Sequence, residues 1–166
     1  MSPLPPDGVR APAFTLPLLP GGSARLADLV DAGGGVLVFF KRDCPTSELL
    51  APRLAPLAEA LRREERLFLA VVQGTEEDAR AFRDAHAQGL PLSWDAAPYD
   101  VSRAYDLSVM PTLLVIDGAG VVAERLEGFV KSEYLALGAS IEQALSLGDI
   151  PPVLLRPAEL PAVSPG

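Results

Sequence analysis

The chain has 166 residues, of which 49% are apolar, and its formal net charge is −8. This length and apolar content predict one folded domain with a substantial core, and they exclude a disordered chain. The negative charge argues against nucleic acid and anionic membrane surfaces as partners. With one cysteine and one histidine, the chain lacks the ligands of an ordinary zinc site and cannot form an intrachain disulfide. We therefore expect no metal and no other cofactor.

Targeting signals are not evident. No apolar run approaches the roughly 20 residues that span a bilayer. The opening MSPLPPDGVRAPAF lacks the basic start and hydrophobic stretch of a secretory signal. If Met1 is the natural start, we expect a cytoplasmic protein.

The first elements predicted along the chain are extended. Residues 1–12 are expected to form an extended arm punctuated by proline, residues 14–18 a short strand and residues 26–30 a short helical turn. The sequence VLVFF at residues 36–40 is apolar at every position. That pattern is typical of a strand buried on both faces of a sheet.

A helix is predicted directly after this strand. Pro45 suits its first turn, where the missing N–H is not needed. Leucines then recur at helical spacing as far as Leu61. Pro52 and Pro56 fall inside that pattern and predict a kink or a break.

The second half of the chain continues the alternation of strand and helix and ends in a hairpin and a helix. The predicted elements are a buried strand at 66–73, a helix from Thr75, an extended piece followed by a helix at 98–105, a hairpin at 112–127 and a helix at 131–147. Parallel crossovers followed by a hairpin make a mixed sheet covered by helices. We divide the chain into a domain of residues 1–148 and a Pro-rich tail of residues 149–166. The tail is expected to lie extended along the body without regular structure.

The lone cysteine, Cys44, follows the buried strand where the helix begins. Unpaired N–H groups and the positive dipole end of a helix favour a thiolate there. Lys41 and Arg42 add positive charge, while Asp43 opposes it. Ser47 lies one turn further on, where its hydroxyl or N–H could donate to the sulfur. Two interpretations of Cys44 stay open, a reactive thiol and a small buried hydrophobe.

Two motifs resemble the thioredoxin-like superfamily. FFKRDCPTS stands where such proteins carry an aromatic-rich strand end and a Cys-x-x-Cys helix start. VMPTLLVID is similar to the segment in which they place a cis-proline facing the active cysteine. The longer spacing between the motifs and the N-terminal APAFTLPLLPGGSARLADL resemble the TlpA/ResA-like redoxin branch, which is related to AhpC/TSA proteins. The resemblance covers about residues 12–147.

The resemblance implies a thioredoxin-like α/β fold. This fold has a mixed central sheet flanked by helices, an N-terminal β-hairpin and an inserted strand and helix, here followed by the extended Pro-rich tail. The resemblance also implies that Met110 touches the sulfur beside a cis-proline. Two interpretations of Glu127-Gly128-Phe129 stay open, an edge of the site and a plain strand end. The expected catalytic residues are Cys44, Ser47 and Pro111, and the expected substrate-binding residues are Met110, Pro45, Thr46, Lys41 and Gly128.

The sequence departs from its relatives at two places. Ser47 replaces the second cysteine, which gives Cys-x-x-Ser; it is a helix-start residue, a partner of the thiolate or an engineered replacement. A peroxiredoxin pattern would need proline and threonine where this chain has Leu37 and Lys41. The sequence CPT nevertheless resembles the residues that follow a peroxidatic cysteine.

Three functions are compatible with these residues. The first is a monothiol thiol–disulfide oxidoreductase of cell redox homeostasis. It would act on a protein or small-molecule disulfide and be released by a small thiol or a thioredoxin-type reductant. The second is a one-cysteine peroxiredoxin-like hydroperoxide reductase with antioxidant activity. The third is a non-catalytic binding module with a thioredoxin fold.

Overall fold

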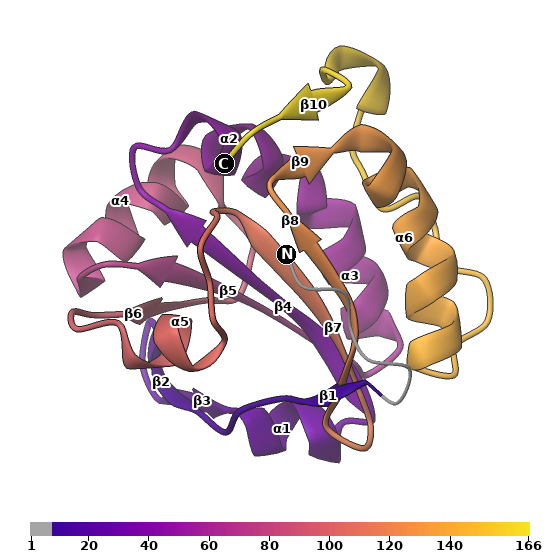
Figure 1. Cartoon of the computed structure of the whole chain (residues 1–166), viewed down its shortest axis with the longest axis horizontal. Helices are drawn as coiled ribbons and strands as arrows, with labels where there is room; N and C mark the ends of the chain where they lie inside the picture. The colour runs from indigo at the N-terminus through magenta and orange to yellow at the C-terminus, as the bar shows by residue number, and fades with distance from the viewer. Residues whose placement is uncertain (1–7) are drawn as a thin grey trace.

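The structure is a computed structural model that describes residues 8–166, so the first seven residues of the expected arm lie outside the described residues. Strands and helices follow the order expected from the sequence (Figure 1). The strands are β1 (Val9–Arg10), β2 (Thr15–Leu19), β3 (Ser23–Arg25), β4 (Gly34–Lys41), β5 (Leu67–Gln73), β6 (Leu92–Asp95), β7 (Thr112–Asp117), β8 (Val121–Glu127), β9 (Phe129–Val130) and β10 (Val163–Ser164). The helices are α1 (Leu26–Asp31), α2 (Pro45–Leu50), α3 (Ala55–Arg63), α4 (Glu76–His86), α5 (Asp100–Ala104) and α6 (Lys131–Ala144), with 3₁₀ turns η1 (Ala51–Leu54) and η2 (Pro157–Glu159).

Eight strands form one mixed sheet with the order β1-β8-β7-β4-β5-β6-β2-β3. β4, β5 and β6 run parallel to one another. The remaining neighbours are antiparallel. β2 and β3 make the expected N-terminal hairpin, and β6 adds the inserted strand between β5 and the hairpin. The thioredoxin-like α/β fold class is confirmed.

β4 is buried on both faces, as its apolar run predicts. Val36, Val38 and Phe40 face a core that α2, α3, α4 and α6 cover. Leu37 and Phe39 face a second core, formed with α1, α5 and the β2–β3 hairpin. All five side chains are fully buried, and burying each one stabilises the fold by roughly 1.5–3 kcal/mol. β4 is therefore the fixed element from which the residues after Lys41 project.

The helix after Cys44 is interrupted, as its prolines predict. α2 ends at Leu50, a 3₁₀ turn carries Pro52, and α3 starts afresh with Pro56 in its first turn. Because proline cannot donate a backbone hydrogen bond, each lies where the regular ladder stops or starts. Among residues 8–166, no helix has the length and hydropathy to cross a bilayer.

The expectation that residues 149–166 form no regular structure was wrong for two short pieces. η2 makes one 3₁₀ turn, and β10 pairs with β9 in a separate two-stranded sheet. Val153, Leu154 and Leu160 are buried in the larger core. The Arg53 carbonyl accepts the Leu155 N–H at 2.9 Å. Apolar anchors and strand pairing, which depend on tertiary contacts, hold this segment on the body.

We expect the substitution Leu160→Ala to destabilise the fold by about 2–3 kcal/mol, since it empties a site that is only 6% exposed. Leu155→Ala, at a side chain 38% exposed in the same segment, should cost less than about 1 kcal/mol. Urea unfolding of the two variants gives the comparison. Equal losses would show that Leu160 does not anchor the segment.

Candidate active site

Cys44 is placed by the transition from β4 to α2. Arg42 and Asp43 turn the chain, with Asp43 in the left-handed region at φ 62°, a conformation that aspartate tolerates. Cys44 is the N-cap residue of α2, and its carbonyl accepts the Glu48 N–H at 3.0 Å. Its side chain makes no capping hydrogen bond and is half-buried. The thiol is thus held at a helix start and is neither sealed in the core nor fully exposed.

The Met110–Pro111 peptide bond is cis, which confirms the expectation for Pro111. The Cys44 thiol donates to the Met110 carbonyl at 3.7 Å. These residues are 66 positions apart, and strand register brings them together because Phe39 of β4 pairs with Thr112 of β7. The chain just before β7 therefore lies beside the chain just after β4. Met110 touches the sulfur as expected, through its main-chain oxygen.

Ser47 is fully buried under the start of α2. Its hydroxyl oxygen accepts the Lys41 N–H at 3.1 Å. This bond ties the first turn of α2 to the end of β4. The hydroxyl keeps its own hydrogen to donate, and donation to the Cys44 sulfur stays a prediction.

The charges around the sulfur are partly engaged elsewhere. Arg42 forms an ion pair with Asp78 of α4 at 3.0 Å. The Thr75 backbone N–H and the Arg42 guanidinium hold the pKa of Asp78 below its usual value. Arg42 is therefore directed toward α4, whereas Lys41 and Asp43 remain beside the thiol, where their opposite charges offset.

A cavity of about 350 Å³ opens at the thiol. It is lined by Lys41, Asp43, Cys44, Gln73, Leu107, Ser108, Val109, Met110 and Gly166. Gln73 was not predicted, although it ends β5 and parallel strands present ligand-facing residues at their carboxyl ends. Gln73 pairs with Lys41 across β5 and β4. Gly166 was also missed, because nothing in the tail sequence signals where it docks.

The other expected substrate-binding residues lie around this cavity without lining it. Pro45 is exposed, and Thr46 is only 2% exposed. The Thr46 hydroxyl is bonded to Ser164 and Pro165 of the tail rather than open to a ligand. Gly128 adopts φ 65°, and its N–H donates to the Pro111 carbonyl at 2.8 Å. The structure brings the expected residues together, while their roles toward a substrate stay predictions.

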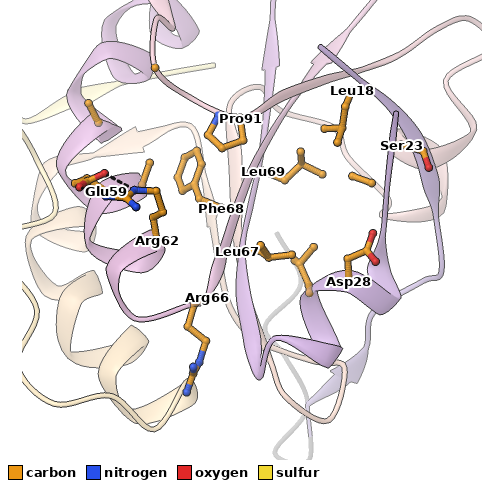
Figure 2. A pocket seen from close by; sticks show the side chains of 15 residues that line it. Leu18, Ser23, Asp28, Glu59, Arg62, Arg66, Leu67, Phe68, Leu69 and Pro91 are labelled. Atoms are coloured by element: carbon orange, nitrogen blue, oxygen red, sulfur yellow. Dashed lines mark hydrogen bonds and ion pairs between the residues drawn. The ribbon is translucent and has the colours of Figure 1, made fainter. Parts of the chain in front are cut away.

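A second cavity lies at the opposite end of the central strands (Figure 2). It measures about 410 Å³ and is lined mainly by apolar side chains, among them Leu67, Phe68 and Leu69 at the start of β5. Figure 2 shows the ion pair of Glu59 with Arg62 on one side of it. Since Leu67 starts the strand that Gln73 ends, this cavity is separate from Cys44.

The comparisons with known proteins agree with this geometry. The model of the AhpC/TSA family matches residues 8–125. A Chlorobium tepidum structure named as a thiol:disulfide interchange protein DsbE is 25% identical, with a TM-score of 0.74 over 83% of this chain and 96% of that one. A structure named as a thioredoxin from Neisseria meningitidis is 25% identical, with a TM-score of 0.69 over 85% and 93% of the two chains.

Another solved structure bears on the fold alone. The thioredoxin domain of a thiol-disulfide oxidoreductase from Bacteroides vulgatus is 19% identical, with a TM-score of 0.65 over 84% of this chain and 94% of that one.

No curated protein matches the chain. The family match and the two structures at 25% identity support a redox function in general. With more than half of its length matched by the family model, this chain belongs to the AhpC/TSA family, in the redoxin branch of the thioredoxin superfamily.

Proposed function

We propose that the protein is a monothiol thiol–disulfide oxidoreductase with Cys44 as its nucleophile. One observation carries the proposal: the half-buried thiol at the start of α2 faces an open cavity and contacts the Met110 carbonyl beside cis-Pro111. A helix start offers unpaired N–H groups and a positive dipole end, which together favour an anion by up to ~1 kcal/mol. Lys41 and Asp43 line the same cavity with opposite charges, so the backbone of the helix start is the main support for the anion.

The reaction is a pair of thiolate attacks. The Cys44 thiolate attacks one sulfur of a disulfide R–S–S–R′, forming the mixed disulfide Cys44–S–S–R and releasing R′–S⁻. No second cysteine exists in the chain to resolve this bond. An external thiolate R″–S⁻ then attacks the R sulfur, forms R″–S–S–R and regenerates the Cys44 thiolate. A small thiol or a thioredoxin-type reductant would supply R″, and a protein or small-molecule disulfide would supply R.

The Met110 main chain has a part in this scheme. Its carbonyl accepts the hydrogen of the resting thiol. Once the sulfur is engaged in a mixed disulfide, it no longer donates to that carbonyl, which can then accept an N–H from a substrate that reaches it. Main-chain pairing of this kind aligns an extended partner without reading its side chains. We assign Met110 and Gly128 to positioning the substrate. We assign Pro111 to shaping the chain between Met110 and β7.

A hydroperoxide reductase is the second candidate, and the match to the AhpC/TSA family favours it. The Cys44 thiolate would attack R–O–O–H, forming Cys44–S–OH and releasing R–O⁻. One external thiol would convert the sulfenic acid to a mixed disulfide with loss of water, and a second thiol would release Cys44. Lys41 stands where the peroxiredoxin pattern has threonine, which weighs against this candidate.

We expect the reduced protein to react once, and only at Cys44, with an aromatic disulfide whose thiolate product is coloured. One equivalent of coloured thiolate should appear per chain, and intact-mass spectrometry should find one aromatic group bound. The Cys44→Ser variant should release none. An unreactive wild-type thiol would leave the non-catalytic binding module as the better description.

A cysteine at position 47 should supply the missing resolving thiol. Residues three apart on a helix are neighbours, with Cβ atoms roughly 5–6 Å apart, and a small adjustment at the helix start brings them to the Cβ separation of about 3.5–4.5 Å that a disulfide needs. Ser47→Cys should therefore release two equivalents of coloured thiolate and end with no aromatic group bound. Ser47→Ala, which removes only the hydroxyl, should still release one. Two aromatic groups bound to Ser47→Cys would show that the thiols do not meet.

The two enzymatic candidates differ in the preferred oxidant. We expect Cys44 to exchange with a small disulfide at least about tenfold faster than hydrogen peroxide converts it to sulfenic acid, because Lys41 stands where the peroxiredoxin pattern has its threonine. Stopped-flow measurement of the coloured thiolate gives the first rate, and dimedone trapping gives the second. Faster peroxide oxidation would favour the hydroperoxide reductase instead.

A further inference from the structure

A short segment of the chain covers one side of the active-site cavity. Val163 and Ser164 pair antiparallel with Val130 and Phe129 of β9. The Ala162 carbonyl also accepts the Lys131 N–H at 2.8 Å. Figure 1 shows the segment ending beside α2. It therefore enters the region of Cys44 as an added strand with main-chain hydrogen bonds.

Thr46 fastens this segment two residues away from the thiol. Its hydroxyl oxygen lies 2.7 Å from the Ser164 hydroxyl and donates to the Pro165 carbonyl. Because a hydroxyl has one hydrogen, Ser164 must be the donor in the bond between the two hydroxyls. Two successive residues of the segment thus satisfy a side chain that is only 2% exposed.

The segment then crosses the main-chain oxygen that contacts the sulfur. A Cβ atom added at Gly166 would overlap the Met110 carbonyl oxygen. One added at Gly128 would lie 3.4 Å from the Gly166 nitrogen. Gly166 therefore occupies the space directly over the Met110 carbonyl, where an incoming main chain would have to pair.

We propose that residues 162–166 are a specificity-determining cover of the active site. They leave the cavity at Cys44 open to small disulfides and occupy the place that a polypeptide disulfide would take. This inference rests on the disulfide exchange proposed above. A polypeptide would react only with the fraction of molecules whose cover is displaced, so its apparent rate equals the uncovered rate multiplied by that fraction. Leu160 lies just before the cover and anchors it to the core.

The test compares two disulfides that carry the same coloured leaving group. In one disulfide the leaving group is bonded to free cysteine. In the other it is bonded to a cysteine within a twelve-residue peptide. Deleting residues 162–166 should raise the rate with the peptide by at least about tenfold and change the rate with the single cysteine by less than about twofold. Adding a synthetic peptide of residues 159–166 to the shortened chain should slow the peptide reaction again.

Two full-length variants complete the test, one expected to displace the cover and one expected to have no effect. Gly166→Val should raise the peptide rate without deletion, because its side chain cannot fit over the Met110 carbonyl. Leu135→Gln should leave both rates unchanged, since the Leu135 side chain is 59% exposed on α6, outside the cover. Equal acceleration of both disulfides by the deletion, or of neither, would overturn the cover.

Alkylation separates failure of the cover from failure of the exchange chemistry. If no disulfide reacts with any variant, the proposed function is wrong, yet the accessibility of Cys44 can still be measured. Iodoacetamide and a maleimide attached to the same twelve-residue peptide probe that accessibility by size. If deletion of residues 162–166 speeds only the reaction of the maleimide–peptide, the result supports the proposed cover. If it speeds neither reagent, or both equally, the proposal of a cover is wrong.

Discussion

The antiparallel register of β4 and β7 is the constraint on which the site depends. Phe39 lies opposite Thr112, so the chain leaving β4 and the chain entering β7 come together at one edge of the sheet. A slip of one residue would turn every buried side chain of β4 toward the wrong face. The two cores, with Phe40 on one side and Phe39 on the other, exclude that slip. Burial therefore fixes the register that brings the segment of Cys44 beside the segment of Met110.

Main-chain and side-chain hydrogen bonds refine this placement more than charge does. Thr112 donates to the Val109 carbonyl at 2.7 Å, and the Gly128 N–H binds the Pro111 carbonyl. Together they hold the loop before β7 against the start of β9. Ser47 performs a similar role on the other side by binding the end of β4. Because Arg42 is paired with Asp78 of α4, backbone groups are the main polar neighbours of the thiol.

The sequence could predict what depends on local pattern and not what depends on distant partners. The apolar run of β4, the interruption of the helix by Pro52 and Pro56, and the helix predicted from Thr75 follow from neighbouring residues, and the structure has them all, with Thr75 as the N-cap of α4. Resemblance added the cis bond before Pro111. The pairing of β10 with β9 escaped prediction because two residues carry no periodicity. The contact of Thr46 with the tail could not be predicted either, because its partners lie more than a hundred residues away in the sequence.

The pairing of β9 with β10 has a further physical consequence. A strand edge without a neighbour is a template on which a second molecule can add its own strand. Lifting β10 away would bare such an edge, but β9 is only two residues long. An edge of this length offers few main-chain hydrogen bonds to a second molecule. Displacement of β10, as the proposed cover requires, would therefore add little tendency to aggregate.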